Sequence, residues 1–120
     1  MMYVDFTAGE KTYKLRLATR NIVALEKAIG RNPVSVFGMS EENMRIPTVT
    51  EMVHILHNSL QKFQHGITIN DAQDIFDAYL EDHNMTDFVQ VITDIYKVSG
   101  IMRDPKEELE EEKNVVAEEI

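Results

Sequence analysis

Four histidines offer metal-ligand chemistry, and two of them are close together in the sequence. His54 and His57 are three residues apart, so they lie on one side of the helix that this stretch predicts, as a pair of metal ligands would. The apolar positions of that helix leave both side chains towards solvent, and His65 and His83 do not stand at metal-site spacing. We interpret the pair as solvated surface histidines.

A series of carboxylates, Asp71, Asp74 and Asp77, repeats every three residues. Neighbouring carboxylates can perform acid–base catalysis or hold a divalent cation. These three occupy the polar side of a predicted helix near its start, where negative charge interacts favourably with the helix dipole. The chain also lacks a nucleophile-elbow sequence and a phosphate-binding loop. We therefore predict no catalytic residue, no cofactor, no bound metal and no enzymatic activity.

Composition limits the partners of the chain. The 120 residues are the size of a single domain and carry a net charge of −9 with no cysteine. The acidic balance argues against binding to nucleic acid phosphates or to an anionic membrane surface, and we expect neither partner. Without cysteine there is no disulfide framework, thiolate metal site or cysteine nucleophile. The sequence shows neither a signal peptide nor an apolar run long enough to span a membrane.

The negative charge is concentrated at the C-terminal end. Residues 101–120 contain eight acidic and three basic side chains, a net charge of −5. We place a boundary near Gly100 and expect the acidic tail beyond it to be helical or disordered. Such a tail is either solvated surface or a binding segment for a basic partner.

Residues 3–17 predict a β-hairpin. Residues 3–7 and 12–17 alternate apolar and polar side chains, and a short polar turn with Gly9 separates them. One face of the hairpin is expected to be buried and comprises Val4, Phe6, Tyr13, Leu15 and Leu17. The second strand leads directly into an amphipathic helix, so we expect residues 12–33 to be the stretch around which the rest of the chain packs.

Helices are predicted over residues 19–29, 48–63, 70–82 and 86–99 from apolar side chains at helical spacing. Thr19 is the expected cap of the first helix, and Thr48 with Glu51 has the spacing of a capping box for the second. The predicted fold class is α+β and mostly α. An N-terminal two-stranded antiparallel hairpin packs on a bundle of about four helices in one domain, residues 1–100, followed by the acidic tail.

The segment from Gly38 to Pro47 is the least regular part of the first hundred residues. It places three apolar side chains, Met39, Met44 and Ile46, in a polar loop directly after Phe37. These side chains either fold back over the core or form an adaptable binding lip, because methionine fits many surfaces. On the second interpretation the candidate partner-binding residues are Phe37, Met39, Met44 and Ile46.

The order of several short sequences resembles a known family. They are Tyr-Lys-Leu-Arg-Leu at 13–17, Asn-Ile-Val-Ala-Leu-Glu at 21–26, Gly-Arg-Asn-Pro at 30–33, Gly-Ile-Thr at 66–68, Ile-Phe-Asp-Ala-Tyr-Leu at 75–80 and Val-Ser-Gly at 98–100. In this order, over about residues 3–100, they resemble the tail assembly chaperones of long-tailed phages and prophages of Gram-positive bacteria.

The resemblance implies a small, mostly helical, non-enzymatic protein. Members of that family are expected to coat the tape-measure protein during tail assembly, to keep it soluble and to help recruit tail-tube subunits. The implied partners are the tape-measure protein and the tail-tube protein, in the cytoplasm of the bacterial host and outside the mature virion. We also expect self-association or stacking along the client, with the hairpin edges as one possible contact.

Two other classes remain open at this point. A small acidic adaptor or DNA-mimicking regulatory protein would carry its carboxylates over one folded face, whereas here they concentrate in the tail. A small hydrolase or metal enzyme would need a cation ordered between carboxylates or histidines, which the spacing does not suggest.

Overall fold

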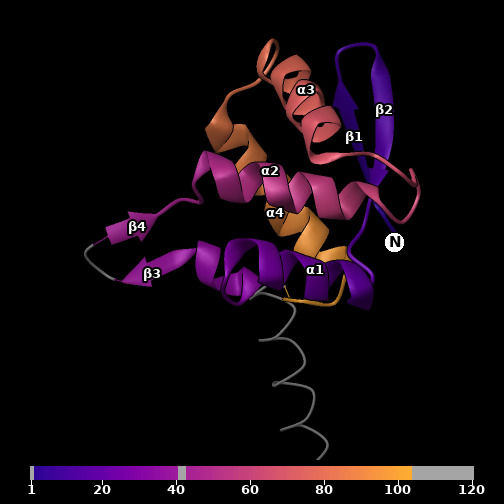
Figure 1. Cartoon of the computed structure of the whole chain (residues 1–120). Coiled ribbons are helices and arrows are strands. Elements are labelled where there is room, and N and C mark those ends of the chain that lie inside the picture. The colour runs from indigo at the N-terminus through magenta and orange to yellow at the C-terminus, as the bar shows by residue number, and fades with distance from the viewer. Residues whose placement is uncertain (1, 41–42, 104–120) are drawn as a thin grey trace, which may run out of the picture.

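The computed structural model describes residues 2–40 and 43–103. Within them, an N-terminal hairpin precedes four α-helices, and a second, shorter hairpin separates the first two helices (Figure 1). The elements are β1 (Val4–Ala8), β2 (Lys11–Leu15), α1 (Thr19–Ile29), the 3₁₀ turn η1 (Pro33–Val36), β3 (Gly38–Ser40), β4 (Asn43–Arg45), α2 (Val49–Leu60), α3 (Ile69–Leu80) and α4 (Met85–Val98). The predicted fold class is confirmed. The acidic tail lies outside the described residues from 104 onward.

The N-terminal hairpin presents one apolar face to the helices. β1 and β2 pair antiparallel with Phe6 opposite Tyr13, and Gly9 has a φ of 63° in the turn that joins them. β1 packs on α3 and α4, and β2 packs on α2. Phe6, Leu15 and the following Leu17 are buried, and Tyr13 is partly buried. The alternation in the sequence therefore identified the correct face.

A side chain from a distant turn covers part of the outer edge of β2. The backbone N–H of Lys14 donates to Gln64 Oε1 at 2.9 Å, and Gln64 Nε2 donates back to the Lys14 carbonyl at 2.9 Å. The same Nε2 also donates to the carbonyl of Leu60 at 2.8 Å. Because the carboxamide satisfies both backbone groups of Lys14, this position is not open to pairing with a further strand.

Helix α2 occupies the centre of the molecule. It packs against α1, α3, α4 and β2, and Figure 1 shows it between α1 and α3. Its buried residues extend almost around the helix and comprise Glu51, Met52, Val53, Ile55, Leu56, Asn58, Ser59 and Leu60. The expectation that residues 12–33 organise the fold is therefore wrong. The apolar pattern marked one stripe on α2, whereas neighbouring elements cover several of its faces.

The ends of α2 differ from the prediction for residues 48–63. The helix ends at Leu60, and two apolar residues of the predicted range, Val49 and Phe63, are 44% and 38% exposed. At its start the predicted capping box is confirmed. Thr48 Oγ1 accepts from the Glu51 N–H at 3.1 Å, and the Glu51 carboxylate accepts from the Thr48 N–H at 2.9 Å.

Equivalent capping boxes begin the next two helices, with Thr68 and Asp71 on α3 and Asn84 and Asp87 on α4. The prediction that Thr19 caps the first helix is wrong, because Thr19 is already helical and Ala18 occupies the cap position. Ala18 has no side-chain oxygen to accept from the first turn. Its own N–H instead donates to Asn21 Oδ1 at 3.0 Å.

The core is one cluster formed by the hairpin, all four described helices and η1, which contributes the fully buried Val36. The Tyr96 side chain is fully buried, and its hydroxyl donates to the Pro33 carbonyl at 2.9 Å. Burial, together with the nearby Glu51 carboxylate, raises the pKa of Tyr96 well above its usual value. No helix in the described part of the chain combines the length and apolarity needed to cross a bilayer.

The segment predicted to be least regular forms a second antiparallel hairpin. β3 and β4 pair with Gly38 opposite Arg45 and Met39 opposite Met44, and their backbones extend away from the helices (Figure 1). We call this hairpin, residues 38–40 and 43–45, the arm. Each strand has only three residues, which is too short for an alternating pattern to be recognised in the sequence.

Candidate functional site

The four predicted partner-binding residues all belong to the arm or its junction with the body. Phe37 directly precedes β3 and is partly buried, with its ring edge-on to Tyr96 at a centroid distance of 5.7 Å. It therefore anchors the arm to the core. Met39 and Met44 face each other in the strand register, but their side chains lie outside what the structure describes. Ile46 follows β4 and is 51% exposed.

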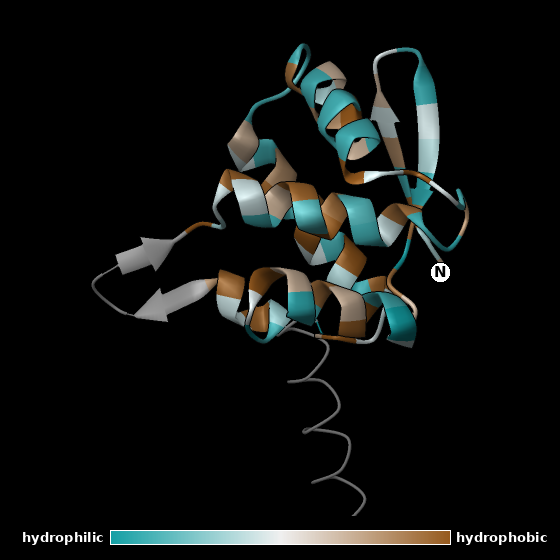
Figure 2. Ribbon diagram, in the orientation of Figure 1, coloured by the Kyte–Doolittle hydropathy of each residue, from teal (hydrophilic) through white to brown (hydrophobic). Residues whose placement is uncertain are grey.

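Exposed apolar side chains flank the base of the arm. Besides Ile46, these are Val34 in η1, which is 40% exposed, and Val49 in the first turn of α2. Apolar positions lie where β3 leaves the body and where β4 returns to it (Figure 2). Val34 and Val49 were not among the candidate binding residues named from the sequence. The position of Val49 directly after the Thr48 cap was the available signal, since end residues of a helix are less completely covered.

A groove between α2 and α3 begins at Val49. Its volume is about 280 Å³, and its lining comprises Val49, Thr50, Val53 and His54 from α2 and Ile69, Gln73, Phe76 and Asp77 from α3. Apolar and polar side chains contribute to it in similar measure. Since Val49 belongs both to this α2–α3 groove and to the base of the arm, the two form a continuous surface with exposed apolar positions.

The groove contains residue types that occur in hydrolytic sites, namely Thr50, His54 and Asp77. None of these three side chains hydrogen-bonds to another in the structure, so they do not form a nucleophile–base–acid relay. Of the other aspartates in the series, Asp71 accepts from the Thr68 N–H in the capping box of α3, and Asp74 is exposed. Within residues 2–40 and 43–103, no group of three or more histidine or acidic side chains is arranged to hold a metal ion.

The histidine pair is less exposed than the sequence predicted. His54 and His57 are both partly buried, and His57 Nε2 lies 3.0 Å from the carbonyl oxygen of Ile67. Gln61 Nε2 donates to the same carbonyl at 2.7 Å. The expectation of solvated side chains was wrong because the turn between α2 and α3 folds back over this side of α2. His57 thus fixes a turn.

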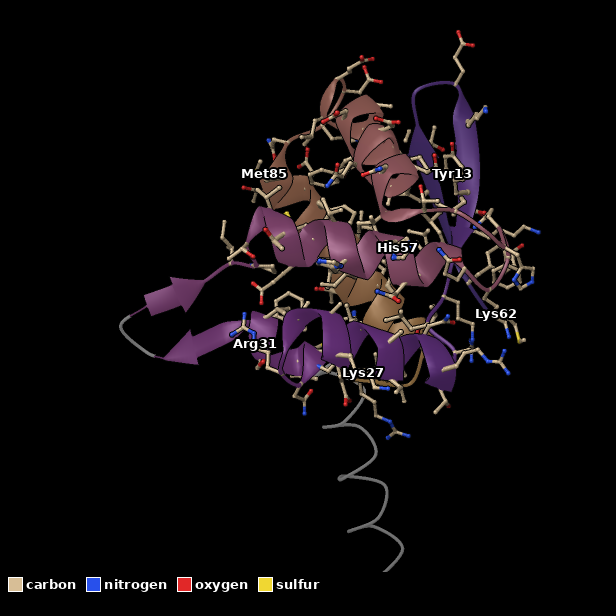
Figure 3. The ribbon with its side chains drawn as sticks, in the orientation of Figure 1. Tyr13, Lys27, Arg31, His57, Lys62 and Met85 are labelled. Carbon is tan, nitrogen blue, oxygen red and sulfur yellow. The ribbon has the colours of Figure 1, made fainter. Side chains whose placement is uncertain are left out.

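An ion pair joins the end of α1 to the start of α2. The guanidinium of Arg31, labelled in Figure 3, binds the Glu51 carboxylate, which also caps α2. Burial alone would raise the pKa of Glu51, but the Thr48 N–H, the Thr48 hydroxyl and Arg31 together hold it below its usual value. In the same way, the backbone and side-chain hydrogen bonds of Thr68 lower the pKa of Asp71. Glu51 therefore stays ionised close to the junction between the arm and the body.

Comparison with known proteins identifies the family and not an activity. No curated protein and no solved structure matches the chain. One family model, described as a family of unknown function (DUF6096), matches residues 4–120. That match includes the hairpin, the arm, all four described helices and the acidic tail. The chain therefore belongs to the DUF6096 family.

Proposed function

We propose that this protein is a phage tail assembly chaperone that binds the tape-measure protein and helps recruit tail-tube subunits. It would act in the cytoplasm of the bacterial host and leave before the virion is complete. The sequence resemblance over residues 3–100 supports the proposal, and the family match leaves the function open. The observation that carries it is the arm, which extends from the body with exposed Val34, Ile46 and Val49 at its base.

This surface suits a helical client. The apolar side chains at the base of the arm and along the α2–α3 groove offer contacts for the apolar stripe of a helix, while polar side chains line the same groove. The surface is small, so one copy would hold its client weakly. Many copies bound along one long tape-measure protein would gain affinity from multivalency.

Co-expression with the tape-measure protein of the same phage or prophage tests the proposal. We expect the chain to raise the soluble fraction of that protein and to co-purify with it. The substitution V49D places a charge on the proposed surface and should reduce co-purification several-fold. V23D is the matched control, because Val23 on α1 is 45% exposed, close to the 44% of Val49, and lies outside both the arm base and the groove.

Two results would overturn the proposal. One is a tape-measure protein whose solubility does not depend on this chain. The other is an equal loss of binding in V49D and V23D, which would mean that the α2–α3 groove and the arm base have no special role. Gene order provides an independent check, since a tube protein should be encoded upstream and a very long helical protein downstream.

A further inference from the structure

A hollow lined by basic side chains lies beside the first turn of α1. Its volume is about 430 Å³, and it is lined by Ala18, Arg20, Asn21, Gln61, Lys62 and His65. We call it the basic hollow. Arg20 comes from α1, whereas Lys62 and His65 come from the turn that follows α2, where Figure 3 labels Lys62. All its titratable side chains are basic in a chain whose net charge is −9.

These basic side chains have no acidic partner in the part of the chain that the structure describes. The ion pair found there is Arg31 with Glu51, at the other end of α1. Among residues 2–40 and 43–103, Arg20, Lys62 and His65 form no ion pair. An acidic segment that entered the hollow would therefore not have to displace a carboxylate already bound there.

Aromatic rings lie next to the basic hollow. Phe63 follows Lys62 in the sequence and is 38% exposed, and the Tyr3 ring packs edge-on against it at 5.6 Å. The Lys62 ammonium lies 5.9 Å from the centre of the Phe63 ring, and the Lys14 ammonium lies 4.8 Å from that of Tyr3. Basic groups beside apolar rings suit an acidic peptide that also carries apolar side chains better than a small inorganic anion.

The chain itself contains a segment with this chemistry. Residues 104–120 carry eight acidic and two basic side chains, a net charge of −6. They also include four apolar side chains larger than alanine, which are Leu109, Val115, Val116 and Ile120. The segment thus combines the negative charge and the apolar groups that complement the hollow and the rings beside it.

The end of α4, which precedes the segment, lies close to the basic hollow. Ser99 Oγ accepts from the Leu17 N–H at 2.9 Å, and Arg16 donates to the Val98 carbonyl at 2.8 Å. The end of α4 is thereby attached to the residues that directly precede Ala18 and Arg20. The 17 residues from 104 onward span about 55 Å when extended, or about 25 Å as a helix. Such a short tether gives an effective concentration on the order of millimolar.

We propose that the acidic segment 104–120 binds the basic hollow of its own molecule. Its carboxylates pair with Arg20, Lys62 and His65, and its apolar side chains pack on Phe63. This inference goes beyond the proposed chaperone function and stands independently of it, since it rests on the charges and the attachment of the tail. A nucleic acid in the same hollow is disfavoured, because the rest of the surface repels polyanions.

The test uses the full-length chain, which has no natural cysteine. N114C provides one site for a nitroxide label and leaves the charge of the segment unchanged. We expect the label to remove most of the NMR peak intensity from the backbone amides of Arg20, Lys62 and His65. Salt at roughly 0.5 M, where the Debye length is about 4 Å, should restore much of that intensity.

Charge reversal distinguishes binding at the basic hollow from nonspecific electrostatic attraction between the segment and the rest of the chain. In the labelled chain, K62E should restore the intensity at Arg20 and His65. K11E is the matched control, because Lys11 is also exposed and the substitution changes the net charge equally, but it lies at the hairpin turn. It should leave the broadening in place.

Three results would overturn the proposal. They are a label that broadens no amide near the hollow, a K62E variant that behaves like K11E, and broadening that occurs only between molecules. The last is measured by mixing isotope-labelled chain without nitroxide and unlabelled chain with it. If the broadening in that mixture is as strong as in the sample where every chain carries the nitroxide, the segment binds a second copy and not its own chain.

Discussion

The ion pair between Arg31 and Glu51 makes a quantitative prediction. E51Q keeps a side chain that can complete the capping box with Thr48, because glutamine serves at this position as well as glutamate. It therefore removes mainly the charge that Arg31 binds. The Arg31 side chain is 29% exposed and that of Glu51 is 9% exposed, so the pair is only partly screened by solvent.

The loss in the free energy of unfolding that we expect for E51Q lies between two limits. Exposed ion pairs contribute about 0.2–1 kcal/mol, and removing one partner of a fully buried pair costs about 3–5 kcal/mol. Because water can still reach Arg31, we expect E51Q to lower the free energy of unfolding by about 1.5 kcal/mol at neutral pH. E51A also loses the bond to the Thr48 N–H, so its cost should be about 1 kcal/mol larger.

Urea unfolding measures both variants. With a slope of about 1–3 kcal/mol/M, E51Q should shift the midpoint down by roughly 0.5–1.5 M. A double-mutant cycle with R31A isolates the pair, because the cost of E51Q should largely disappear when Arg31 is absent. An unchanged cost of E51Q in the R31A background would refute the role given to the ion pair.

The dependence on pH gives a second check. The folded-state pKa of Glu51 lies below its unfolded value, so ionised Glu51 contributes its full stability above the unfolded pKa, which is near 4.3. That contribution is lost as the pH falls through the folded pKa. The difference between wild type and E51Q should therefore shrink below about pH 4.3. A difference that stays constant down to pH 2 would contradict this account.

Three further substitutions test the packing described above. L56A removes a fully buried side chain of α2 and should cost about 3 kcal/mol in urea unfolding, and a cost below about 1 kcal/mol would contradict the central position of that helix. Y96F removes the hydroxyl that donates to the Pro33 carbonyl and should cost about 1–1.5 kcal/mol, which calorimetry would record as a lower melting temperature. G9A places a side chain at a φ of 63° and should cost about 1 kcal/mol. The cost would come from the backbone and not from a clash, because the added Cβ would lie 3.8 Å from the Cβ of Ala78.

Local features of the fold could be predicted from the sequence. The capping box of Thr48 and Glu51 depends on residues three positions apart, and the alternation around Phe6 and Leu15 reports directly on a sheet with one buried face. Both signals remain valid whatever packs nearby. The fold class was recoverable for this reason.

Features that depend on distant segments could not be predicted in the same way. Gln64 hydrogen-bonds to the backbone of Lys14, 50 residues away in the sequence. Nothing about a glutamine at this position predicts that contact. Ile55 is fully buried because another element covers a face of α2 that the apolar stripe left open. The candidate surface was partly recoverable. Ile46 was named from composition, whereas the exposure of Val34 and Val49 depends on where the arm leaves the body.

The position of α2 also determines whether parts of the protein can unfold separately. Because α1, α3, α4 and β2 all pack on this helix, none of them can detach without exposing part of the same apolar core. The amide hydrogens of Ile55 and Leu56 should therefore exchange with solvent deuterium only when the whole chain unfolds, at the slowest rate in the protein.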